Sequence, residues 1–384
     1  MHGNQEILSL TRSMAVSTVE SRLAVLHEIL LARLENIDRI AIAIYDPSSD
    51  LLKTFASSNR GATPLRAYEA RLAEVPSLQQ LAEAHASRVI HDIPSALVGD
   101  SAHSRWLREQ GFQSSFTLPV YFGQQLAGFV FMDSKRSDAF GASTLGFVES
   151  FAQLASQLYL SQLASSRGLI GTVQIASRIA SIRDVETGAH LERMAKYARL
   201  IARGLAARGS PLSDEFIEYV HLFAPLHDIG KVGIPDRILL KPGRLDSEEF
   251  RIMQGHVHLG LRMIDEMVVD MGLDDSMAAR IMRNVVGTHH ERGDGSGYPL
   301  GLHADQIPLE GRIIAVADVF DALSTARPYK QAWPFDECVA HLRELAALGR
   351  LDPECVDVLL EQPQQLFAIQ RQFADPETGL SGDG

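Results

Sequence analysis

The chain has 384 residues, a formal net charge of −12, 46% hydrophobic residues and 22% charged residues. This length predicts two or three domains with ordinary hydrophobic cores. The acidic charge argues against a broad grip on duplex nucleic acid, which needs a basic face. No apolar run approaches the roughly 20 residues that span a bilayer, and the N-terminus lacks the basic start and apolar stretch of a signal peptide. We therefore expect a cytoplasmic protein without membrane insertion.

The sequence contains only two cysteines, Cys338 and Cys355. They can form at most one disulfide, and they are too few to hold zinc as a cysteine cluster. We expect two reduced, partly buried thiols.

The N-terminal part of the chain reads as an α+β domain. Apolar residues at helical spacing predict a helix over 18–36, and two further helices are expected near 77–86 and 102–110. Turns at 46–49 and 123–125 are expected to join hairpin partners. Strands are predicted at 39–45, 51–56, 88–91, 114–122 and 126–133.

Two stretches in this part, 111–120 (GFQSSFTLPV) and 128–134 (GFVFMDS), resemble a GAF domain. The resemblance implies a small sensor that binds a ligand or dimerises, which we assign to residues 1–160. An α+β domain that binds no ligand remains an equal alternative.

A long helical pattern follows over residues 142–182, interrupted only by Gly168 and Gly171. We assign residues 161–182 to a linker helix, which suits a homodimer seam or the transmission of a signal. The alternative is the last helix of the first domain followed by the first helix of the next.

After residue 183 the chain reads as an all-α domain that extends to residue 384. Several prolines punctuate the predicted loops between its helices. Helices are predicted at 187–207, 213–228, 246–268, 274–290, 310–326, 335–347 and 352–361.

Histidines gather in this second domain, because eight of the fourteen lie between His190 and His303. Glu186 and His190 are four residues apart and share one helical face. Adjacent residues converge only at a helix end, and Gly230 supplies such a stop after His227-Asp228. The remaining candidate ligands, on further helices, are His256, His289, His290 and Asp318.

The chemistry of this set points to metal binding. A carboxylate such as Asp318, in an apolar helical frame, is buried and paired or is a ligand, because a bare buried charge is too unfavourable. Imidazole and carboxylate without thiolate suit iron or manganese, with zinc or nickel as substitutes. Two such ions close together activate water and neutralise charge in phosphoryl transfer.

The order and local context of these residues resemble the HD-GYP family of the HD hydrolase superfamily over roughly residues 170–350. The resemblance rests on four stretches: 183–193 (RDVETGAHLER), 227–235 (HDIGKVGIP), 289–299 (HHERGDGSGYP) and 318–330, which contains DVFDAL and RPYK. It implies a helical HD domain that cleaves cyclic di-GMP to pGpG, with GMP as the alternative final product.

The resemblance also implies the roles of individual residues. Asp228 is the expected bridge between metals, and Glu186 implies a third metal beside the usual two. Lys231 lies one turn beyond His227 and is assigned to a phosphate oxygen and the leaving group. The implied metal ligands are Glu186, His190, His227, Asp228, His256, His289, His290 and Asp318. The implied substrate-binding residues are Lys231, Arg327, Lys330 and Tyr298.

Tyr298 lies in a glycine-rich loop, 294–299, which we expect at the lip of the site. In the family this loop is associated with contacts to diguanylate cyclase domains, and packing is the alternative role. His221 and His258 are expected to be structural or surface residues, and His303 a loop residue. The stretch between His256 and His289, which contains residues 268–275, is longer than the family leads us to expect. This weakens the assignment of substrate more than that of metal.

Two other functions remain open from the sequence. The helical domain could be a non-catalytic cyclic di-GMP receptor that signals by contact, although its complete ligand set argues against this. Alternatively, it is an HD-superfamily hydrolase of another cyclic nucleotide, which the Gly-Tyr-Pro loop and a substrate panel would distinguish.

Overall fold

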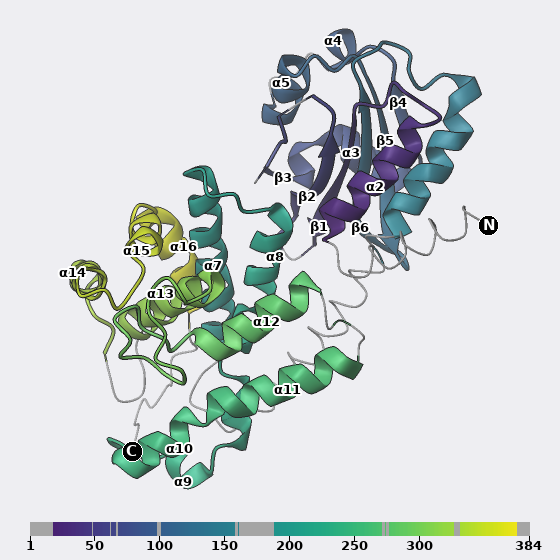
Figure 1. The fold of residues 1–384 in the computed structure, drawn as a ribbon. Helices are drawn as coiled ribbons and strands as arrows, with labels where there is room; N and C mark the ends of the chain where they lie inside the picture. The colour runs from purple at the N-terminus through teal and green to yellow at the C-terminus, as the bar shows by residue number, and fades with distance from the viewer. Residues whose placement is uncertain are drawn as a thin grey trace, which may run out of the picture. The chain divides into compact units, whose positions relative to one another are not determined.

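The computed structural model describes residues 18–157, 160 and 188–374, apart from residues 48, 62, 67, 98–100, 271, 272, 274, 275 and 326–330. The chain divides near residue 166 into two compact units, each with its own core (Figure 1). The predicted α+β fold of the first unit and helical fold of the second are confirmed. The predicted linker helix, 161–182, lies outside the described residues.

The first unit is built on one antiparallel sheet, in which the strand order is β3-β2-β1-β6-β5-β4. All five predicted strands are present, and β3 is an additional short edge strand. The strands are β1 (Arg39–Asp46), β2 (Leu51–Asn59), β3 (Glu69–Arg71), β4 (Arg88–Ile90), β5 (Ser114–Phe122) and β6 (Gln125–Ser134).

Side chains that alternate along each strand give the sheet two buried faces. On β1, Ile40 and Ile42 join a core formed with α2 (Val19–Leu31) and the helical residues 142–157. Ala41 and Ala43 point to the opposite face, which carries a smaller apolar cluster. The first helix ends at Leu31, five residues before its predicted end, with Ala32 as its cap.

Short helices complete the unit on the side of the smaller cluster. Leu78 of α3 packs into that cluster, and Leu107 of α5 packs into a satellite cluster with Ile90 and Phe112. The bounds are η1 (Leu72–Glu74), α3 (Pro76–Ala84), α4 (Ile93–Ala96) and α5 (Ala102–Glu109).

The second unit is a bundle of helices around one large apolar core. Its central helix, α13, packs against α7, α12, α14 and α15. The longer helices are α7 (Gly188–Ala207), α8 (Asp214–Phe223), α10 (Ser247–Gln254), α11 (His256–Asp270), α12 (Met277–Thr288), α13 (Leu309–Ser324), α14 (Phe335–Ala347), α15 (Pro353–Leu360) and α16 (Pro363–Gln372). Short turns are η2 (Ala224–Leu226), η3 (Ile229–Gly233) and α9 (Asp236–Leu239).

Two helices are shorter than the sequence predicts. The helix expected over 213–228 ends at Phe223, because Pro225 cannot continue the hydrogen-bond ladder and a 3-10 turn replaces it. The helix expected over 246–268 is broken at Gly255 into α10 and α11. Both breaks leave a histidine, His227 or His256, directly after the interruption.

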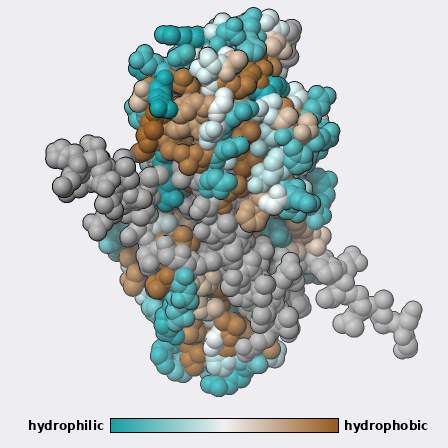
Figure 2. Space-filling model, turned by 90° about the vertical axis from the view of Figure 1, so that its right-hand side faces the viewer, coloured by the Kyte–Doolittle hydropathy of each residue, from teal (hydrophilic) through white to brown (hydrophobic). Residues whose placement is uncertain are grey.

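Among the described residues, no helix combines the length and apolar composition that crossing a membrane requires. The visible face in Figure 2 mixes hydrophilic residues with hydrophobic ones. Scattered apolar side chains of this kind are normal on a protein surface and need no special explanation.

Candidate metal centre

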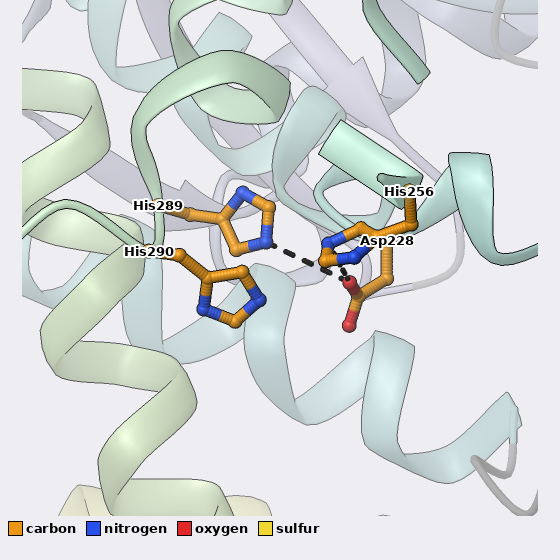
Figure 3. A group of neighbouring side chains, drawn as sticks. All are labelled: Asp228, His256, His289 and His290. Atoms are coloured by element: carbon orange, nitrogen blue, oxygen red, sulfur yellow. Dashed lines mark ion pairs between the residues drawn. The ribbon is translucent and has the colours of Figure 1, made fainter. Parts of the chain in front are cut away.

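Side chains from distant parts of the second unit converge into two neighbouring groups. In one group, the candidate ligand atoms of Asp228, His256, His289 and His290 all lie within 4.8 Å of one another. Figure 3 shows these four side chains, which come from three segments of the chain, gathered around the Asp228 carboxylate. The second group consists of His190, His227 and Asp318, whose candidate ligand atoms also lie within 4.8 Å of one another.

Three of the histidines owe their position to the end of a helical segment. The last carbonyls of a helix have no partner within the helix, and a side chain can satisfy them. The Nδ1–H group of His227 donates to the Ala224 carbonyl at 2.9 Å, and that of His256 to the Met253 carbonyl at 2.8 Å. His289 does the same with the carbonyls of Val285 and Val286, at 3.1 and 3.0 Å.

These hydrogen bonds fix the tautomer and leave the Nε2 atom of each ring as the candidate ligand. Within the described part of the chain, Nε2 of His256, Nε2 of His289 and Oδ1 of Asp228 are buried and make no hydrogen bond. Buried polar atoms without a partner are unfavourable. A cation between them would satisfy all three, so the residues present fit a bound metal.

The Asp228 carboxylate lies between the two groups. Its Oδ1 atom is 3.0 Å from Nε2 of His256 and 3.6 Å from Nε2 of His289, whereas Oδ2 is 3.1 Å from Nε2 of His227. Oδ2 also lies 2.9 Å from Nζ of Lys231. One carboxylate therefore faces both groups, as the sequence led us to expect of a bridging ligand.

Electrostatics favour the metal-binding forms of Asp228, His289 and His290. Burial alone would raise the pKa of Asp228, but the charges of Lys231 and His227 lower it well below the ordinary value. Burial lowers the pKa of His289, and burial together with the charge of His289 lowers that of His290 well below its usual range. An ionised carboxylate and neutral imidazoles are the metal-binding states.

The second group contains two residues that sequence reasoning missed, Asp321 and Arg193. Nδ1–H of His190 donates to Oδ2 of Asp321 at 2.7 Å, and Arg193 donates to the same carboxylate at 2.6 and 3.0 Å. Asp321 follows Asp318 by one turn of α13, so the two carboxylates reach the same region. Although burial raises the pKa of Asp321, hydrogen bonds from His190 and Arg193 bring it below the ordinary value.

The glycine-rich loop after His290 is folded tightly against the site. Glu291 is buried, and its carboxylate accepts hydrogen bonds from the main-chain N–H groups of Leu300 and Leu302 at 2.7 and 2.9 Å. The Tyr298 ring lies 4.6 Å from that of His290, between ring centroids. Tyr298 is therefore beside the candidate ligands, and Glu291 is the anchor that the sequence did not reveal.

Arg292 is a further residue of the site that sequence reasoning missed. Its guanidinium donates to the carbonyls of His289 and Glu291 at 3.3 and 3.0 Å. Burial lowers the pKa of Arg292, while the charge of nearby Asp318 opposes this shift. A half-buried cation thus adjoins the second group.

Some of the other residues predicted from the sequence lie outside the described part of the chain, and others lie away from the two groups. Glu186, Arg327 and Lys330 lie outside the described residues, so their positions stay predictions. His258 and His303 are exposed, and Nδ1 of His221 is bonded to the Ala195 carbonyl, away from the two groups. Both cysteines are buried.

Gly230 has a different role from the helix stop that the sequence predicted. It lies inside η3, and a Cβ atom there would be 1.9 Å from the carbonyl oxygen of His256 and 2.5 Å from the nitrogen of Gly260. Its missing side chain allows η3, next to Asp228, to touch the first turn of α11.

We expect Gly230→Ala to lower the free energy of unfolding by about 1–3 kcal/mol through overpacking, and to weaken metal binding by displacing Asp228 from His256. Chemical denaturation and metal titration would measure the two effects. The control is Gly146→Ala, because a Cβ atom at Gly146 meets nothing within 4 Å. Unchanged stability and metal affinity in Gly230→Ala would show that η3 and α11 can separate without consequence.

Comparison with protein families gives two matches. A GAF domain model matches residues 18–158, and an HD domain model matches residues 174–355. A solved GAF domain/HD domain protein from Geobacter sulfurreducens is 15% identical, with a TM-score of 0.30, over 37% of this chain and 93% of that one.

Several curated proteins are similar to about half of the chain. The cyclic di-GMP phosphodiesterase response regulator RpfG of Xanthomonas campestris is 44% identical over 53% of this chain and 50% of its own length. A cyclic di-GMP phosphodiesterase of Thermotoga maritima is 39% identical over 56% and 55% of the two chains. The 3'3'-cGAMP-specific phosphodiesterase 2 of Vibrio cholerae is 39% identical over 50% and 34%. The chain thus spans about half, or less, of the length of these relatives.

Proposed function

We propose that this chain, which matches a GAF domain and an HD domain, is a metal-dependent phosphodiesterase of the HD-GYP type. Its proposed reaction is the hydrolysis of cyclic di-GMP to pGpG, with GMP as the alternative final product, under the control of the GAF domain. The supporting observation is the pair of ligand groups that share the Asp228 carboxylate.

We assign the metal ligands as the sequence predicted them, with two ions at the described groups and Glu186 as a ligand for a third. Imidazole and carboxylate donors favour iron or manganese. When bound, the ions supply an activated water and neutralise negative charge on the phosphodiester. His190, His227, His256 and His289 hold their rings by Nδ1, so that little rearrangement is needed when an ion enters.

The cations near the groups are assigned to the substrate phosphates. Lys231, beside Asp228, places its ammonium where it can hold a phosphate oxygen and the leaving oxygen. Arg292 adds a second positive charge on the side of Asp318. Arg327 and Lys330 stay proposed phosphate ligands from the sequence, and Tyr298 forms a wall next to His290 where a base can lie.

The substrate assignment follows the names of the relatives. Relatives at 44% and 39% identity are named for cyclic di-GMP, and one at 39% identity is named for 3'3'-cGAMP. We therefore place cyclic di-GMP first, and keep the hybrid dinucleotide as the alternative cyclic nucleotide.

We expect chelation to abolish hydrolysis and to lower the unfolding temperature, because ions that bind only the folded chain stabilise it. At an ion concentration 100 times the dissociation constant, this contribution is about 2.7 kcal/mol. Protein purified without oxygen is analysed for metal, and then assayed with cyclic di-GMP and 3'3'-cGAMP before chelation, after it, and after addition of iron or manganese.

The outcomes separate the three candidate functions. Formation of pGpG that is lost on chelation and restored by metal supports the phosphodiesterase. Tight binding of cyclic di-GMP without product would instead identify a receptor. Turnover of 3'3'-cGAMP without turnover of cyclic di-GMP would identify a hydrolase of another cyclic nucleotide.

The cellular location, the oligomeric state and the protein partners remain proposals from the sequence. We expect a cytoplasmic homodimer that joins through the GAF domain and the linker helix 161–182. Contact of the 294–299 loop with diguanylate cyclase domains would bring the enzyme to the source of its substrate.

A further inference from the structure

The helix α16 approaches the metal centre from beyond the matched HD domain. The HD domain model ends at residue 355, whereas α16 spans Pro363–Gln372. The helix packs against α7, which carries His190 (Figure 1). Its apolar anchor is Leu366, which is fully buried in the core of the second unit. A segment that the HD domain model does not match therefore lies against a helix that bears a candidate ligand.

The carboxyl end of α16 is held by the same arginine that holds Asp321. Nη1 of Arg193 donates to the main-chain carbonyl of Phe373 at 2.8 Å. Nε and Nη2 of Arg193 donate to Oδ1 and Oδ2 of Asp321, at 2.6 and 3.0 Å. The planar guanidinium is thus engaged on two sides, one toward the end of α16 and the other toward the carboxylate.

The Phe373 carbonyl is a favourable partner for this cation because it lies at a helix end. The last carbonyls of a helix have no partner within the helix, and the helix dipole gives this end a partial negative charge. A nearby cation is therefore stabilised, most strongly where it is buried, as Arg193 is. Loss of the carbonyl would break a buried hydrogen bond, which favours a shift of the guanidinium away from Asp321.

Asp321 passes this arrangement on to a candidate ligand. Oδ2 of Asp321 accepts a hydrogen bond from Nδ1–H of His190 at 2.7 Å, beside the one from Arg193. An outer carboxylate of this kind fixes the orientation of a ligating imidazole ring. Three consecutive hydrogen bonds thus connect the end of α16 to His190, through Arg193 and Asp321.

The other group of candidate ligands is held by different elements. Nδ1–H of His256 donates to the Met253 carbonyl at the end of α10. Nδ1–H of His289 donates to the carbonyls of Val285 and Val286 in α12. A change at α16 should therefore act on the second group, which contains His190, and leave this one unchanged.

We propose that α16 is a positioning element of the metal centre, and that the Phe373 carbonyl strengthens ion binding at the second group by keeping Arg193 against Asp321. The second group is taken here to bind an ion, so the inference rests on the proposed function. A docked α16 keeps the guanidinium in place and the His190 ring oriented. A partner that displaces α16 would release one ion without touching any ligand.

Ala374→Pro tests the carbonyl without changing any side chain of the connection. Ala374 is exposed, and Phe373 before it has a ψ of 46°. A following proline favours a ψ of about 120–160° at the preceding residue, so the variant turns the Phe373 carbonyl away from Arg193. We expect the affinity for one ion per chain to fall about three- to tenfold, less than the loss of about 10- to 100-fold for direct outer partners of a ligand.

The measurement is a manganese titration of the full chain after its metal has been removed, with free manganese followed by electron paramagnetic resonance. It requires no turnover of substrate. The affinity for the ion at the group of His256 and His289 should be unchanged in Ala374→Pro. The matched control is Ala374→Ser, which does not restrict the preceding residue and should bind both ions like the wild type.

Leu366→Ala tests the docking of the whole helix. Removing this buried side chain should loosen α16 and lower the unfolding temperature. The matched control is Leu342→Ala, which removes an equally buried leucine of the same core from α14, a helix that packs against α13 and α15. We expect both variants to lose stability, but only Leu366→Ala to weaken the binding of one ion.

Two results would overturn the inference and leave the proposed function intact. One is wild-type manganese affinity in Ala374→Pro. The other is an equal loss of affinity in the two leucine variants, which would make α16 a structural helix only. If the wild-type chain bound no manganese, the metal centre itself would be wrong, and the inference with it. The wild-type titration therefore tells these failures apart.

Discussion

Replacement of Asp228 by alanine should lower kcat for cyclic di-GMP by about a thousandfold, the change that corresponds to losing several kcal/mol of charge stabilisation by metal. The reason is that both oxygens of this carboxylate face candidate ligands, Oδ1 toward His256 and Oδ2 toward His227. One substitution therefore weakens both ion positions together. Metal content per chain and product formation are measured on the same preparation.

The matched control for this prediction is Asp305→Ala, at an exposed carboxylate of the same unit. It should keep full metal content and activity. If the Asp228 variant retained two ions per chain and normal turnover, the shared-carboxylate arrangement would have no part in the reaction.

The second large effect is expected at Asp321, the buried carboxylate that joins His190 to Arg193. Changing it to asparagine leaves the Arg193 charge buried without its partner, which should lower the free energy of unfolding by about 3–5 kcal/mol. The variant also loses the charged carboxylate that accepts a hydrogen bond from Nδ1–H of His190, which should weaken metal binding by about 10 to 100-fold. Denaturant titration and metal titration measure the two effects separately.

A positioning role differs from a purely structural one in its response to metal. Excess metal should restore activity to Asp321→Asn, because its ligands are intact, but not to the Asp228 variant. The matched control is Asp265→Asn, which removes a more exposed ion pair with Arg283 and should change stability by no more than about 1 kcal/mol. If the Asp321→Asn variant bound metal with wild-type affinity, the role of Asp321 would be structural only.

The candidate ligand residues could be named from the sequence, but the way they are held could not. Imidazoles and carboxylates in a distinctive order are enough to single out His227, Asp228, His256 and His289 as candidates, and the structure brings them together in two neighbouring groups. The carbonyls that fix these rings are main-chain atoms, which carry no residue-specific signal. The repeated placement of a histidine at the end of a helical segment is the one pattern that could have revealed them.

The anchors escaped prediction for a different reason. Asp321 and Glu291 are ordinary acidic residues in sequence. The partners described above lie 131 and 128 residues from Asp321, and 9 and 11 residues from Glu291. Only the packing of α13 against α7 and the fold of the loop show what they hold. Gly230 was misjudged because a helix stop and a close approach of two segments both favour glycine.

In the first unit, alternation of apolar residues was sufficient for the strands and their hairpins. It gave no indication of strand order, which decides that Arg88 and Thr117 share a row. Strand order depends on pairing between segments far apart in the chain, so it could not be derived from local patterns. The predicted sensor role of this domain therefore had no ligand chemistry attached to it.

The turn that carries His289 and His290 also carries Glu291, which pins the Gly-Tyr-Pro loop through Leu300 and Leu302. In the proposed phosphodiesterase, the ion site and the loop at its entrance would be joined directly, because Glu291 follows His290 in the chain. Ions of different radius should then shift Tyr298 by different amounts. The supply of iron and manganese would in that case influence which cyclic dinucleotide the proposed enzyme degrades faster, without any change in the protein.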